Sequence, residues 1–124
     1  MFKVIGHLYK LKAYYENTIS TQETLIRKIK QQKYSDVPEL SEKTKELMTN
    51  IQEETETLKQ NILLYATELN VEATLDSLIE SCGRDMKKDI LSIKEKVMQL
   101  EKHTNDVLLE ASDLIQEHMN ELDC

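Results

Sequence analysis

Apolar residues recur at alternating spacings of three and four along most of the chain, a pattern that predicts amphipathic helices. The first predicted helix runs from about Val4 to Lys33. Thr18 and Gln22 fall on its apolar stripe, so the middle of this helix is expected to be polar. The apolar members of the stripe are Val4, Leu8, Leu11, Tyr15, Ile19, Leu25, Ile26 and Ile29.

The second predicted helix runs from about Val37 to Leu69 and also carries one apolar stripe. Near its end, Ile62–Ala66 is apolar on all sides, which predicts cover on more than one side. Asp36 is a candidate N-cap with Glu39 three residues later, and Pro38 fits the first turn. The stripe comprises Leu40, Leu47, Ile51, Leu58, Ile62, Tyr65 and Leu69, with Met48 at its edge.

Two further helices are predicted after Leu69. Thr74 is placed to cap a short helix that carries Leu75, Leu78, Ile79 and Cys82, and Gly83 is placed to end it. A last long helix, capped by Asp85, should reach about Leu122. Its main stripe comprises Met86, Ile90, Ile93, Val97, Leu100, Leu108, Ala111, Ile115 and Leu122, and widens beyond Thr104 to include Val107, Leu114 and Met119.

The scarcity of helix breakers sets the expected architecture. The chain has one proline and two glycines in 124 residues, so little interrupts a helix for about thirty residues at a time. We therefore expect an all-α protein, an antiparallel bundle of three long helices with one short connecting helix, in a single domain spanning residues 1–124.

Charge and cysteine content narrow the class of partner. The net charge of −7, with Lys scattered among Glu and Asp, argues against binding to nucleic acid or to an anionic membrane. No apolar stretch approaches the roughly 20 residues that span a membrane, and the opening residues are too short for a secretory signal. Cys82 and Cys124 suit free thiols in a reducing cytoplasm, so a cytoplasmic location is expected.

Catalytic and metal-binding patterns are not found in the sequence. There is no glycine-rich phosphate loop, and none of His7, His103 and His118 has the Glu that a Glu-x-x-His metal motif requires. His103 and His118 are more than about 20 Å apart by helical rise, too far to share a metal ion. We expect no enzyme activity, no metal and no cofactor.

Two features off the regular pattern indicate protein binding. Thr18, Gln22, Thr55 and Thr104 interrupt their stripes near mid-helix, which predicts a polar layer that loosens the helices and sets their register. Leu91, Met98 and Leu109 share one side of the last helix, away from its core face. They are either scattered exposed apolar residues or the edge of a groove that receives a partner helix.

Three segments resemble the FlgN family of flagellar type III export chaperones. The turn into the second helix, Tyr34–Leu47, is similar to the family's "g-D-x-x-x-L" segment followed by a Lys- and Glu-rich helix. Thr74–Ile79 is similar to its short "tL-x-x-L" helix, and Asn105–Leu109 to the "N-x-x-L-L/I" pattern of its last helix.

The resemblance implies a protein without enzyme activity that binds the C-terminal helices of hook-filament junction proteins. Such a chaperone prevents premature assembly of its clients and delivers them to the export apparatus. The family places client binding on the last helix, which implies a site at Leu100, Val107, Leu108, Ala111, Leu114, Ile115, Met119 and Leu122. The alternative is a structural coiled-coil subunit that oligomerises through the same helix faces.

Overall fold

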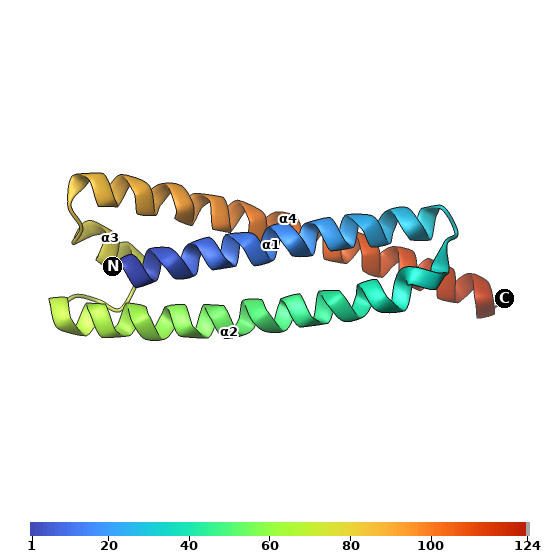
Figure 1. Ribbon diagram of the computed structural model, residues 1–124, viewed down its shortest axis with the longest axis horizontal. Helices are drawn as coiled ribbons and strands as arrows, with labels where there is room; N and C mark the ends of the chain where they lie inside the picture. Colours follow the sequence, from blue (N-terminus) through green and yellow to red (C-terminus); the bar gives the residue numbers. More distant parts are fainter. Residues whose placement is uncertain (124) are drawn as a thin grey trace.

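A computed structural model describes residues 1–123, with side chains as far as residue 121, and places four α-helices in the order shown in Figure 1. They are α1 (Phe2–Lys30), α2 (Val37–Leu69), α3 (Leu75–Glu80) and α4 (Arg84–Asp123), with a 3₁₀ turn, η1 (Tyr34–Asp36), between α1 and α2. No strand occurs in residues 1–123. The predicted all-α class, with three long helices and one short helix, is confirmed.

Helix α1 lies between the other two long helices. Helices α1 and α4 both start at the end that holds the N-terminus, and α2 returns in the opposite direction (Figure 1). Helix α1 packs against both α2 and α4, whereas no Cα atom of α2 comes within 8 Å of any Cα atom of α4 in the described residues. The short helix α3 contacts both α2 and α4 at the N-terminal end.

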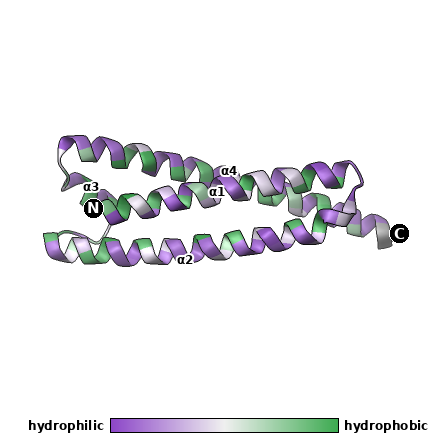
Figure 2. Cartoon of the chain, in the orientation of Figure 1, coloured by the Kyte–Doolittle hydropathy of each residue, from purple (hydrophilic) through white to green (hydrophobic). Residues whose placement is uncertain are grey.

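The stripe predicted for α1 is confirmed residue by residue, because all eight apolar members are buried. Thr18, Thr21 and Gln22 are buried with them, so α1 hides a broad face that serves two neighbours. Polar and apolar positions alternate along α2 and α4 as well (Figure 2). The buried apolar residues of these two helices are Leu47, Ile51, Leu58, Ala66, Ile90, Ile93, Val97, Val107 and Ala111.

The expectation that Ile62–Ala66 is covered on more than one side is wrong. Leu63 and Leu64 remain 58% and 61% exposed, and only Ala66 of this segment is fully buried. The cover comes from α1 and from α3, which has only six residues and shields a narrow part of α2. The end of α2 therefore leaves leucines in solvent.

Two candidate N-caps behave differently because their backbones differ. Thr74 has an extended backbone (φ −130°, ψ 152°), and its Oγ1 accepts a hydrogen bond from the Ser77 N–H at 3.1 Å. Asp36 has a helical backbone (φ −90°, ψ −8°) and makes no side-chain cap bond. Its carboxylate lies 3.1 Å from Lys28 Nζ instead. The Thr74 prediction is confirmed, and the capping role of Asp36 is wrong.

Helix α4 begins one residue before the predicted cap. The Gly83 carbonyl accepts a hydrogen bond from the Lys87 N–H at 2.8 Å, so Gly83 stands at the start of α4. Asp85 lies in the first turn, where its charge complements the helix dipole. Helix α1, in turn, ends at Lys30 rather than Lys33, because the chain turns through Gln32 at a φ of +59°.

The core consists of two apolar clusters, and a buried polar layer lies within one of them. One cluster lies at the α3 end around Leu8, and the other lies toward the α1–α2 turn around Leu25. Within the second cluster, between Ile19 and Leu25 along α1, Gln22 Nε2 donates to Thr44 Oγ1 at 2.5 Å, and the Thr44 hydroxyl donates to the Leu40 carbonyl at 3.0 Å. The buried polar middle of α1 was predicted, and its partner on α2 is Thr44.

Thr55 does not belong to this layer, contrary to the prediction. It follows Thr44 by eleven residues, which places it about 16 Å further along α2. Thr104 of α4 does belong to the layer. It is buried, with 1% of its surface exposed, and the neighbouring His103 lies 4.0 Å from Glu23, the residue after Gln22 on α1. Its hydroxyl has no hydrogen-bond partner, whereas the Thr18 hydroxyl donates to the Tyr14 carbonyl at 2.8 Å.

Replacing Thr104 with valine should stabilise the protein. The isosteric change removes a buried hydroxyl that has no partner, so the free energy of unfolding should rise by about 1 kcal/mol. Urea denaturation followed by circular dichroism measures the change. Thr18→Val is the matched control, because it loses an existing hydrogen bond and should show no gain. A lower stability for Thr104→Val would show that the hydroxyl is satisfied.

Candidate functional site: a groove between α2 and α4

The separation of α2 from α4 leaves a groove whose floor is α1. Residues from both walls and from the floor line two hollows along it. We call this surface the α2–α4 groove. From Leu8 to Leu25 its floor spans 18 residues of α1, or about 25 Å of helix. The length corresponds to roughly five helical turns.

The half of the groove next to α3 is mainly apolar. It holds a cavity of about 270 Å³. Met98 lies on the α4 wall and stays 58% exposed, and its flexible thioether suits an adaptable contact surface. Leu75 of α3 lines the same cavity, so the short helix borders this end of the groove. The lining residues are Leu8, Leu11, Tyr15, Thr55, Leu58, Leu75, Lys94, Val97, Met98 and Glu101.

The other half mixes apolar and polar side chains in a cavity of about 260 Å³. Gln22 lies in its floor and Thr44 in its α2 wall, and the two are hydrogen-bonded to each other. The groove therefore presents an apolar segment followed by a segment able to accept polar groups. The lining residues are Gln22, Leu25, Ser41, Thr44, Leu108, Ala111, Ser112, Ile115 and Gln116.

The surroundings of Tyr15 in the apolar half shift the pKa of its phenol. Burial raises the pKa of the Tyr15 phenol above its ordinary value of 10.0, and the negative charge of Glu101 raises this pKa further. Both effects favour the neutral phenol. Tyr15 thus acts as a largely apolar part of the groove floor near neutral pH.

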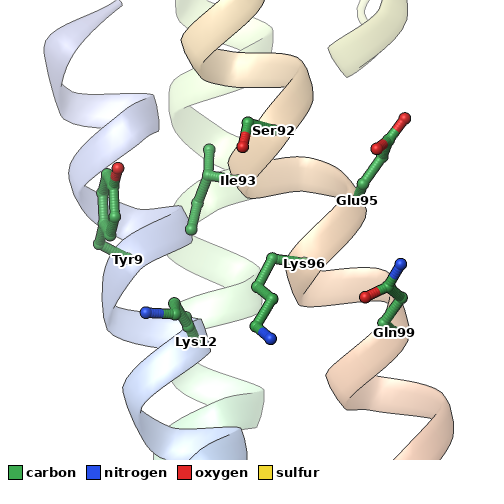
Figure 3. Close-up of a pocket in the computed structure, with 7 residues that line it drawn as sticks. All are labelled: Tyr9, Lys12, Ser92, Ile93, Glu95, Lys96 and Gln99. Carbon is green, nitrogen blue, oxygen red and sulfur yellow. The ribbon is translucent and has the colours of Figure 1, made fainter.

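A third hollow, between α1 and α4, has a different character (Figure 3). Ile93 points toward α1, whereas Glu95 and Gln99 point away from it. The amino groups of Lys12 and Lys96 point in different directions and do not converge on a common point (Figure 3). Lys12 is already paired with Glu16, at 3.4 Å between Nζ and Oε1. The lining does not form a built binding site.

The structure places ten of the eleven predicted partner-binding residues, in three environments. Val107 and Ala111 are core residues that pack with α1, and Leu100 and Leu114 pack against the same core. Met98, Leu108 and Ile115 do line the groove, along with the buried Ala111. Leu91, Leu109 and Met119 are exposed and line neither cavity, and the side chain of Leu122 lies outside the described residues.

The floor and the α2 wall of the groove were not predicted as parts of a site. Leu8, Leu11 and Leu58 were predicted as ordinary core residues and are buried, and nothing in a stripe pattern shows that a cavity lies beside them. The only sequence signal was the breadth of the stripe on α1, which exceeds what one neighbouring helix requires.

Other polar clusters serve the packing of helices. His7 Nδ1 is hydrogen-bonded to Glu54 Oε1, and Asn61 Nδ2 donates to His7 Nε2 at 3.2 Å, which ties α1 to α2. Cys82 is half-buried, and its thiol donates to the Leu78 carbonyl. Cys124 lies outside the described residues.

Residues 1–123 contain no group of three or more His, Cys, Asp or Glu side chains placed to hold a metal ion. Over the same residues, no helix combines the length and the apolar character that crossing a bilayer requires.

Comparison with known family models, with curated proteins and with solved structures finds no match to this chain.

The raised pKa of Tyr15 predicts a loss of stability at high pH. The fold favours the neutral phenol, so its contribution is complete below pH 10.0 and is lost as pH rises through the higher folded-state pKa. Tyr15→Phe should therefore reduce the fall in unfolding free energy between pH about 9 and about 11. Urea denaturation at both pH values measures the difference.

Glu101→Gln is the companion variant, because it removes the second cause of the raised pKa and leaves the tyrosine in place. It should reduce the same fall by a smaller amount than Tyr15→Phe. An identical pH dependence in the wild-type protein and Tyr15→Phe would contradict the buried position of the phenol.

Proposed function

We propose that this protein binds a helical segment of another protein in the α2–α4 groove. The observation that carries the proposal is the pair of cavities between α2 and α4, two long helices that share α1 and have no Cα atoms within 8 Å of each other in the described residues. A helix laid in this gap would pack on α1, α2 and α4 together. The three long helices would then act as an open bundle that the partner closes as a fourth helix.

The position of the short helix α3 favours a helical partner rather than an extended one. At one end it already occupies the space between α2 and α4, and its Leu78 and Ile79 are almost completely buried there. The chain itself thus fills part of this gap with a helix. Beyond Leu75 the gap continues without such cover, next to Leu58 and Val97.

The more specific form of the proposal is a flagellar type III export chaperone. The resemblance of Tyr34–Leu47, Thr74–Ile79 and Asn105–Leu109 to the FlgN family supports this form. Its clients would be the C-terminal helices of hook-filament junction proteins, which the chaperone would keep unassembled and deliver to the export apparatus in the cytoplasm. The chemistry required is apolar docking of a helix, with no catalysis.

The geometry refines which residues would hold such a client. Val107 and Ala111 support α4 from within, because both are buried against α1. Met98, Leu108 and Ile115 would contact the client from α4, and Thr55 from α2, beside the buried Leu58. The proposed site therefore involves three helices rather than the face of α4 alone.

A structural subunit that oligomerises remains the second candidate, and one observation favours it. Phe2 begins α1, Leu63 and Leu64 lie near the end of α2, and all three are strongly exposed. These two helix ends lie at the same end of the molecule (Figure 1), which suits self-association. Light scattering separates the two functions. A monomer that forms a one-to-one complex with a client supports the chaperone, and a stable homo-oligomer that ignores clients supports the structural subunit.

Introducing a charge at Met98 should weaken client binding. A glutamate there would place an unpaired charge in the apolar half of the groove, so the dissociation constant should rise by about tenfold or more. Fluorescence anisotropy with labelled C-terminal peptides of the junction proteins from the same genome measures this change.

Leu64→Glu is the matched control for Met98→Glu. Leu64 is 61% exposed, close to the value for Met98, but it lines neither cavity of the groove. It should leave both the affinity and the circular dichroism spectrum unchanged. Equal effects of the two substitutions would rule out the groove as the binding surface.

A further inference from the structure

The mixed half of the groove contains a hydrogen-bond acceptor that the fold leaves unused. Gln22 lies in the floor of this cavity and is only 3% exposed. The Thr44 hydroxyl donates its one proton to the Leu40 carbonyl, so Gln22 must present its amino group to Thr44. The carbonyl oxygen, Oε1, lies on the other side of the Gln22 amide and accepts no hydrogen bond within the described residues.

This oxygen is within reach of a molecule in the cavity. In the part of the chain with described side chains, Thr104 Oγ1 is the one fully enclosed side-chain polar atom without a partner, so Gln22 Oε1 is not fully enclosed. The accessible space that Gln22 borders is the cavity of about 260 Å³. A polar side chain that is more than nine-tenths buried, with a free acceptor beside a cavity, indicates a hydrogen-bonding site.

The rest of the lining fits an uncharged polar group. None of the nine lining residues is charged, whereas the apolar half of the groove includes Lys94 and Glu101. Ser41 on the α2 wall and Ser112 on the α4 wall add two hydroxyl groups that can donate or accept. A charged group brought here would lose its hydration without meeting an opposite charge in the lining, and an apolar group would leave Gln22 Oε1 unpaired.

An amide side chain suits the cavity better than a hydroxyl. On a helix, a threonine or serine hydroxyl often donates to the carbonyl four residues earlier, as Thr18, Thr21 and Thr24 do in this protein. Such a hydroxyl has no proton left for a second acceptor. Asparagine and glutamine carry two N–H groups and one carbonyl, so they can donate to Gln22 and accept from a serine of the walls together.

We infer that the partner helix carries one glutamine or asparagine, within an otherwise apolar face, that donates to Gln22 Oε1. This inference rests on the proposed function and specifies the sequence of the partner. Leu11, in the floor of the apolar half, precedes Gln22 by eleven residues, or about three helical turns. The amide therefore stands about three turns from the centre of the partner's apolar contacts. A single buried polar pair fixes the register, because a shift by one turn would place the amide against apolar side chains.

The test compares three synthetic helical peptides of 18 residues, the length of the groove floor, that differ at one position. Their shared face is leucine, and the variable residue, eleven positions after the second leucine of that face, is Gln, Leu or Glu. Fluorescence anisotropy with the full-length protein measures each dissociation constant. The Gln peptide should bind about fivefold more tightly than the Leu peptide, which leaves Gln22 unpaired. It should bind about tenfold more tightly than the Glu peptide, whose carboxylate cannot donate to Oε1.

The Gln22→Met variant provides the decisive arm, because it keeps the length of the side chain and removes the amide. It should prefer the Leu peptide over the Gln peptide, and circular dichroism verifies that it is folded. Gln99→Met is the matched control, since Gln99 is exposed and lines the hollow between α1 and α4 instead, and it should keep the wild-type order. If Gln22→Met does not fold, Ser41→Ala/Ser112→Ala replaces it and should cut the advantage of the Gln peptide by about half.

The outcomes separate the two proposals. Equal binding of the three peptides, or a wild-type preference for the Leu or Glu peptide, overturns the inference and leaves the helix-binding groove standing. The same Gln-to-Leu affinity ratio in the wild type and in Gln22→Met, or a loss of preference in Gln99→Met, also overturns it. Failure of all three peptides and of the natural client helices to bind overturns the groove itself.

Discussion

The burial of one broad face of α1 between two helices is the constraint on which the rest of the structure depends. Each of α2 and α4 buries its own stripe against α1, and neither comes within 8 Å of the other between Cα atoms in the described residues. A helix with a single narrow stripe would need only one neighbour. Because α1 serves two, the space between those neighbours becomes a groove, and α3 occupies only its end.

The polar layer fixes the register between α1 and α2. The hydrogen bond between Gln22 and Thr44 can form only at one alignment of α1 with α2. It lies between Ile19 and Leu25 of the apolar cluster nearer the α1–α2 turn. The half of the groove next to α3 is mainly apolar, and the other half contains the polar side chains of Gln22 and Thr44. The polar layer that fixes the register therefore also makes the two ends of the groove chemically different.

Periodicity was enough to identify the helices and the buried stripe of α1, because burial on a helix repeats with the helical turn. It could not identify the groove, because a stripe shows which face is buried and not which neighbour covers it. Leu58 was predicted as a core residue and Met98 as either a scattered surface residue or the edge of a groove, and both line the same cavity. The caps show the same limit, since Thr74 and Asp36 are both suitable residues and only their backbone angles decide which one caps.

Disulfide trapping across the groove tests most directly whether α1 holds α2 and α4 apart. In a Cys82→Ser/Cys124→Ser background, Thr55→Cys and Met98→Cys place one thiol on each wall. Because Cα atoms more than about 7 Å apart cannot be bridged without backbone movement, mild oxidation should not join them, whereas a longer bismaleimide reagent should. Rapid and complete disulfide formation would show that the two helices close on each other, and would contradict an open groove.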